Sequence, residues 1–142
     1  MKRFRLRDVL RARLVQENSA RGELLRARRE AAEAAERVRR MDAAIGARPR
    51  PDSPSGVAFA ATMWARQAMA GELSIAVAAA GEADATVDAR TEDLTAAATR
   101  RRIVEKLAER HAEAERAAEQ AAEQREVDDL TSTRNRGGNH TR

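Results

Sequence analysis

The stretch that most constrains the fold is a charged segment near the C-terminus, residues 103–130, with the sequence IVEKLAERHAEAERAAEQAAEQREVDDL. Its small or apolar residues recur every three or four positions, at Val104, Leu107, Ala114, Ala118 and Ala121. Nearly every other position is charged, Gln or Ala. This spacing predicts a narrow apolar seam along a solvated coiled-coil helix. Because one helix cannot bury such a seam alone, another part of the chain or a partner must cover it.

Composition narrows the fold class to all-α. Aromatic residues make up 2% of the 142 residues, Cys and Tyr are absent, and 33 residues are Ala, which forms helices well but buries little apolar area. With 35% charged residues, this composition is typical of a coiled coil. No apolar run reaches the roughly 18 residues that cross a bilayer, and the basic N-terminus lacks the apolar region of a secretion signal. We therefore expect a soluble, cytoplasmic protein.

A first long helix is predicted over residues 4–45. Apolar residues follow three-and-four spacing from Leu6 to Ile45, except that Arg13 and Glu17 interrupt the seam and Leu14 stands one place off it. These interruptions predict a stutter near the start of the helix.

A turn is predicted over residues 46–55, and a second helix over residues 56–131. Gly46 and all three prolines fall in the turn, where Ser53 is a candidate N-cap. Gly71 and Gly81 leave open a break in the second helix, since each costs up to about 1 kcal/mol relative to Ala. Residues 1–133 then form one antiparallel coiled-coil hairpin, and the basic residues 134–142, which lack periodicity, form a disordered tail.

The charge distribution favours antiparallel pairing. Residues 1–30 carry ten basic and four acidic side chains, whereas residues 105–129 carry nine acidic and four basic ones. We therefore expect the basic first arm to cover the acidic end, with Leu10 facing Asp128 and Ile45 facing Asp93. In that register, residues 56–92 have no partner in the first helix and form an overhang.

No catalytic or metal-binding pattern is evident. His111 and His140 are the only histidines, and no glycine-rich loop precedes a helix. We expect no enzymatic activity, cofactor or metal. The basic run Arg100–Arg102 suggests nucleic-acid binding, but no aromatic residue accompanies it and the acidic second arm would repel phosphate, so we expect no nucleic-acid partner.

Three short motifs, in this order and spacing, resemble the flagellar export protein FliJ family. They are FRLRDVLR at residues 4–11, EKLAER at residues 105–110 and EQREVDDL at residues 123–130. Ser55-Gly56, Trp64 and Leu73 are also similar to the middle of that family. The resemblance spans nearly the whole chain, which departs from the family pattern in its Ala content and its proline-broken turn.

The resemblance implies a non-enzymatic stalk. Members are antiparallel two-helix coiled coils that bind the export ATPase FliI hexamer, the membrane export gate protein FlhA and export chaperones, and so couple energy to protein export. By this resemblance the chain associates peripherally with the cell membrane through the gate. The implied ATPase-binding residues are Phe4, Leu6, Val9, Leu10, Glu123, Gln124, Glu126, Asp128, Asp129 and Leu130. The implied gate-binding residues are Phe59, Met63, Trp64, Leu73 and Val77.

Two other functions stay open on the sequence. The stalk protein of a virulence type III secretion system would carry similar motifs. A structural coiled-coil scaffold that dimerises in parallel would show the same composition and seam, but would not pair its own two arms.

Overall fold

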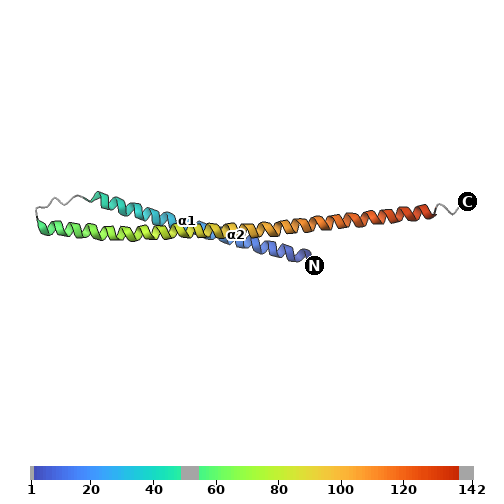
Figure 1. The fold of residues 1–142 in the computed structure, drawn as a ribbon, viewed down its shortest axis with the longest axis horizontal. Helices are drawn as coiled ribbons and strands as arrows, with labels where there is room; N and C mark the ends of the chain where they lie inside the picture. The colour runs from blue at the N-terminus through green and yellow to red at the C-terminus, as the bar shows by residue number, and fades with distance from the viewer. Residues whose placement is uncertain (1, 49–54, 138–142) are drawn as a thin grey trace. The chain divides into compact units, whose positions relative to one another are not determined.

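Two long helices make up nearly all of the chain that the structure, a computed structural model, describes, namely residues 2–48 and 55–137. Helix α1 spans Lys2–Ala47 and helix α2 spans Gly56–Gly137 (Figure 1). The described ranges contain no strand. The two helices form a hairpin, which confirms the predicted all-α, antiparallel two-helix fold.

The chain divides into two compact units, each of which contains part of both helices. Unit 1 consists of Met1–Arg13 with Thr99–Arg142, and unit 2 is the continuous stretch Leu14–Ala98. Unit 2 holds the turn, so it forms a hairpin by itself. At its turn end, the Arg66 guanidinium of α2 donates a hydrogen bond to the Arg48 carbonyl just after α1, at 3.4 Å.

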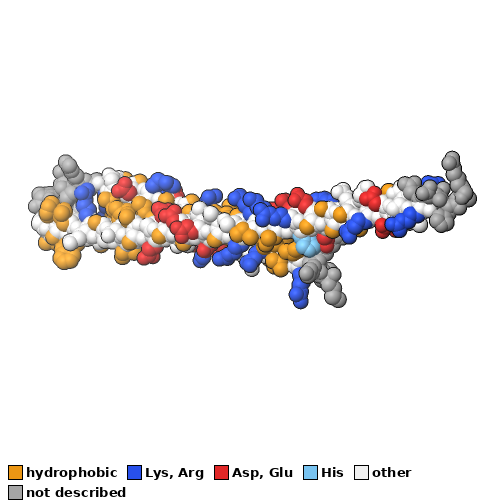
Figure 2. Space-filling view, turned by 45° about the vertical axis from the view of Figure 1, so that its right-hand side comes forward, with side chains coloured by type: hydrophobic (Ala, Val, Ile, Leu, Met, Phe, Trp, Pro, Cys, Tyr) orange, Lys and Arg blue, Asp and Glu red, His pale blue; other side chains and the backbone are white. Residues whose placement is uncertain are grey.

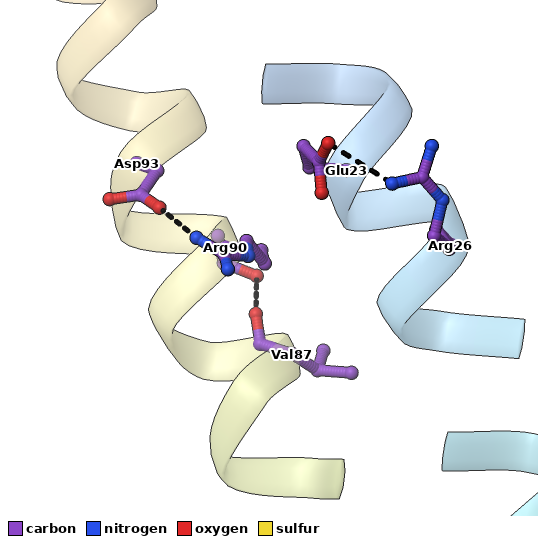
Figure 3. A network of polar contacts seen from close by, with 6 residues as sticks. Glu23, Arg26, Val87, Arg90 and Asp93 are labelled. Atoms are coloured by element: carbon purple, nitrogen blue, oxygen red, sulfur yellow. Dashed lines mark hydrogen bonds and ion pairs between the residues drawn. The ribbon is translucent and has the colours of Figure 1, made fainter. Parts of the chain in front are cut away.

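The predicted register of the hairpin is wrong. In unit 2 the end of α1 lies beside Arg66, the eleventh residue of α2, and α2 begins beyond the end of α1 (Figure 1). Further along, Glu23 and Arg26 of α1 lie near Arg90 of α2 (Figure 3). Ile45 therefore lies nearer to Arg66 than to Asp93. Of the predicted overhang, residues 56–92, only the first residues of α2 extend beyond α1, and the remainder lies beside it (Figure 1).

Connection length explains the corrected register. Eight residues separate Ala47 from Gly56, so the end of α1 must lie within a few turns of the start of α2. The predicted register relied on exposed charge pairs, each of which is worth only a few tenths of a kcal/mol. Several such pairs lie within one helix, as in the contacts Arg26–Glu23 at 3.1 Å and Arg90–Asp93 at 3.0 Å (Figure 3). Because α1 has 46 residues and α2 has 82, the surplus falls at the C-terminal end of α2.

Helix α1 carries an unbroken heptad seam, so the predicted stutter is wrong. Arg13 is half-buried and Glu17 is 8% exposed, both at seam positions, while Leu14 points outward at 43% exposure. The Glu17 carboxylate accepts a hydrogen bond from Arg21 at 3.5 Å, and the aliphatic stems of long side chains fill seam positions well. The buried or half-buried seam positions of α1 are Leu6, Leu10, Arg13, Glu17, Ala20, Leu24, Ala27, Ala31, Ala34, Val38, Met41 and Ile45.

The core is narrow because most seam residues are small. Its buried apolar side chains are Leu24, Ala27, Ala34, Ala76 and Ala97, each 5–8% exposed, and no described side chain is fully buried. This core is one layer of contacts between two helices, as the Ala content predicts.

The ends of α2 differ from the predicted ones. Ser55, rather than Ser53, caps the helix: its hydroxyl accepts from the Ala58 amide at 3.4 Å and its carbonyl from the Phe59 amide at 3.1 Å. Ser53 lies outside the described residues. At the other end, α2 continues to Gly137, so residues 134–137 of the predicted tail are helical, whereas residues 138–142 lie outside the described part.

Side chains near the C-terminus bond to the backbone of the last turns of α2 or carry charges that suit a helix end. The hydroxyls of Thr131, Ser132 and Thr133 donate to backbone carbonyls three or four residues earlier, at 2.7–3.0 Å. Arg134 and Arg136 stand in the last turn, where the helix dipole favours a cation.

Helix α2 has no break at Gly71 or Gly81. A Cβ atom added at either glycine would meet nothing within 4 Å, so both lie in open space on the helix surface. Neither glycine is needed for a bend or a close contact. The neighbouring seam residues Leu73, Ala76 and Ala80, which are buried or half-buried, hold the helix in place.

Candidate docking surfaces

The C-terminal arm, residues 116–136 of α2, has no cover in the structure. Within unit 1, half-buried positions of α2 run from Arg101 to Glu115 and then stop. Every residue from Arg116 to Arg134 is exposed. The first residues of α1 therefore cover only the start of the acidic stretch. There the half-buried positions include Val104, Ala108, His111 and Glu115, so the predicted seam residues Leu107 and Ala114 point outward instead. Ala118 and Ala121 are uncovered because they lie beyond the last half-buried position.

The arm presents an acidic row that ends in apolar residues. Glu119, Glu123 and Glu126 are spaced by four and three positions, so they share one face of the helix, and Leu130 continues that face. Leu130 is 68% exposed and Val127, which borders a shallow depression with it, is 54% exposed. Such a row complements a basic surface that has an apolar recess.

Local hydrogen bonds order part of this arm. The Gln124 side chain donates to the Asp128 carboxylate at 3.2 Å, and Arg125 donates to the Ala121 carbonyl at 3.0 Å. These contacts follow one helix, so they hold the polar side chains against their own backbone. The arm is thus a single helix with its side chains presented to solvent.

The structure does not bring the two halves of the predicted ATPase-binding end together. Leu6 and Leu10 are half-buried seam residues, and Val9 is 42% exposed beside them. Phe4 belongs to α1, but its side chain lies outside those that the structure describes. Glu123 begins eight residues beyond Glu115, the last half-buried position, which is about 12 Å along a helix. The five remaining predicted residues, Gln124, Glu126, Asp128, Asp129 and Leu130, are exposed on the arm.

The second surface is the apolar start of α2 in unit 2. Between residues 57 and 80 only Arg66 and Glu72 are charged, although one side alone faces α1. Hydrophobic side chains gather at this end of the hairpin (Figure 2). A helix that is apolar on nearly every side is normally buried, so this segment is a candidate for further contacts.

The predicted gate-binding residues fall on three sides of this segment. Phe59, Met63 and Val77, which are 48–52% exposed, each follow a seam position by one residue and share one flank of α2. Leu73 is a half-buried seam residue, and Trp64, 74% exposed, lies on the opposite flank. An open depression is lined by Phe59, Ala60, Met63, Trp64, Arg66, Gln67 and Ala70.

Sequence reasoning found these side chains but missed the uncovered arm. The signal that could have found it was the unequal length of the two helices on either side of the proline-rich turn. Among the described residues no group of three or more His, Cys, Asp or Glu side chains could hold a metal. Within the same residues, no helix is both long and apolar enough to pass through a membrane.

Comparison with known proteins gives one match. The family of the flagellar FliJ protein matches residues 1–139 of the 142 residues. No curated protein and no solved structure matches significantly.

Proposed function

Because this chain belongs to the flagellar FliJ family, we propose that it is a cytoplasmic, non-enzymatic stalk of the flagellar protein export apparatus. In this role it binds the export ATPase FliI hexamer through its C-terminal arm and the gate protein FlhA through the apolar start of α2, and so couples energy to export. The observation that carries the proposal is the arm itself, a long helical segment that the hairpin leaves uncovered.

A stalk needs length and stiffness. At a rise of 1.5 Å per residue, the 82 residues of α2 correspond to roughly 120 Å of helix. Ion pairs within the helix support this segment, for example the Arg101–Glu105 pair at 2.6 Å. These features suit a protein that transmits contacts between partners.

The acidic row supports the ATPase contact. Residues 119–129 of the arm carry five acidic side chains and one basic one, so a basic partner surface would attract this stretch and orient it during encounter. Exposed apolar side chains at Val127 and Leu130 supply the contact area that charge alone lacks.

The test is a titration of the purified chain with the export ATPase. Reversing two acidic charges, with Glu126→Arg and Asp128→Arg, should weaken binding about tenfold or more and reduce its salt dependence. The matched control reverses two exposed acidic residues elsewhere on α2, with Glu82→Arg and Glu92→Arg, and should leave binding unchanged. Equal affinities for the two double variants would refute the assignment of the arm.

The gate contact is tested separately. Phe59→Ala with Val77→Ala removes exposed apolar area from one flank of α2 and should weaken binding to the gate protein. Val15→Ala, at a 63% exposed position on α1, is the control. Binding of export chaperones and peripheral placement at the membrane follow from the same proposal, and both should depend on these partners.

A further inference from the structure

The start of α2 carries a second heptad stripe that α1 does not cover. It consists of Val57, Ala61, Trp64, Ala68, Gly71 and Ile75, which are spaced by four and three residues in strict alternation. Every one of these residues is exposed, and the three large ones are 72–82% exposed. The stripe is separate from the flank that holds Phe59, Met63 and Val77.

The spacing of this stripe is that of a coiled-coil seam. Most of its residues directly precede a buried or half-buried position of α2, so the stripe borders that side of the helix in unit 2. A further helix packed on the stripe would give α2 a second seam and form a larger bundle. Since the stripe holds no charged residue, only apolar and small groups would enter such an interface.

We propose that this stripe binds the same stripe of a second copy of the chain, in antiparallel orientation. A two-fold axis near Arg66 places Trp64 of one copy against Ala68 of the other, Ala61 against Gly71, and Val57 against Ile75. The Trp64 indole of each copy then lies against a small residue, Ala68, of the other copy. Self-complementarity of this kind is what a two-fold interface requires.

The charges next to the stripe permit self-association. In this dimer, Glu72 of one copy would face the Val57 end of the stripe of the other copy. The Glu72 residues of the two copies would then lie about 18 Å apart along the helix. The two Glu72 carboxylates are therefore not brought together.

The size of the stripe predicts a weak dimer. Trp64 can bury roughly 150–250 Å², and with Val57 and Ile75 the stripe supplies about half of the roughly 800 Å² that each partner buries in a standard interface. We expect a dimer with a micromolar dissociation constant, which forms where copies are concentrated. This inference does not depend on the ATPase contact, and the stripe shares only Trp64 with the implied gate-binding residues.

Sedimentation equilibrium of the full chain over a range of concentrations tests the dimer. We expect a monomer–dimer equilibrium, with emission from the single Trp shifting to the blue as concentration rises. Ile75→Gln should raise the dissociation constant about tenfold or more, whereas Leu130→Gln, at a comparably exposed position on the arm, should not. A chain that stays monomeric up to millimolar concentration would overturn the proposal and assign the stripe to another partner.

Cross-linking tests the orientation. The chain has no Cys, and both Ala61→Cys and Gly71→Cys fall at exposed positions that accept a side chain. A short bis-maleimide reagent should link the two variants when they are mixed, but should not link either variant to itself. Self-linking without mixed linking would indicate a parallel dimer and contradict the proposed axis. A loss of gate or ATPase binding in other variants would bear on the proposed function alone.

Discussion

Replacement of Leu24 by Ala tests the helix contact most sharply. Leu24 is 5% exposed and is the largest of the buried apolar side chains in the core of unit 2. Leu-to-Ala changes in protein cores cost about 2–5 kcal/mol. Here the core is one layer deep and contains no fully buried side chain, so we expect the lower end, about 2–3 kcal/mol.

The neighbouring residue supplies the control. Leu25 is 54% exposed, so Leu25→Ala changes the same side chain at the adjacent position and should cost about 0.5 kcal/mol or less. Urea unfolding followed by circular dichroism measures both variants, and the two share the same change in helix propensity. Equal losses of stability, or a larger loss for Leu25→Ala, would refute the placement of the seam.

Four further predictions concern single residues. Glu17→Leu, at a buried seam position, should raise the unfolding midpoint by the equivalent of about 1 kcal/mol or more, since an apolar side chain fills the site without a carboxylate to desolvate; a lower midpoint would show that the carboxylate is needed. Ser55→Ala should cost about 1 kcal/mol through loss of the N-cap, and Ser74→Ala on the same helix surface is its control. Gly81→Ala should stabilise the chain by up to about 1 kcal/mol, because nothing blocks the added Cβ; destabilisation would show that a contact has been missed. The hydrogen bond from Arg39 and its positive charge lower the pKa of Glu36 from 4.5, so this carboxylate stabilises the fold above about pH 4.5 and loses that effect as pH falls; Glu36→Gln should flatten the acid side of a melting-temperature profile, and an unchanged profile would contradict this.

Much of the fold follows from the sequence because the controlling signals are local. The three-and-four spacing and the Ala content predict two helices, and the prolines predict the turn between them. That the seam continues through Arg13 and Glu17 could not be predicted, because it depends on how the aliphatic parts of these side chains pack against α2. Likewise, α2 continues to Gly137, where composition alone suggested a tail from residue 134.

The register of the hairpin was wrongly predicted because the prediction relied on the weaker of two effects. Opposite charges at the two ends of the chain suggested that Leu10 pairs with Asp128, but exposed charges contribute little and the short connection decides the pairing. The same error concealed both surfaces. The acidic arm was predicted to be covered by the first helix, and the residues from Val57 to Ile75 were predicted to belong entirely to an overhang. In the corrected register there are two candidate docking surfaces: the uncovered C-terminal arm, and the start of α2, which exposes apolar side chains on both flanks.

Hydrogen exchange of the chain with and without the export ATPase tests the central proposal most directly. We expect amides of the C-terminal arm, residues 116–136, to exchange fast in the free chain and to become protected in the complex. Amides of the part of α2 in unit 2, residues 56–98, most of which lies beside α1, should change little. Protection that appears only in residues 56–98, with the arm still exchanging freely, would contradict the proposal that the arm is the ATPase-binding end.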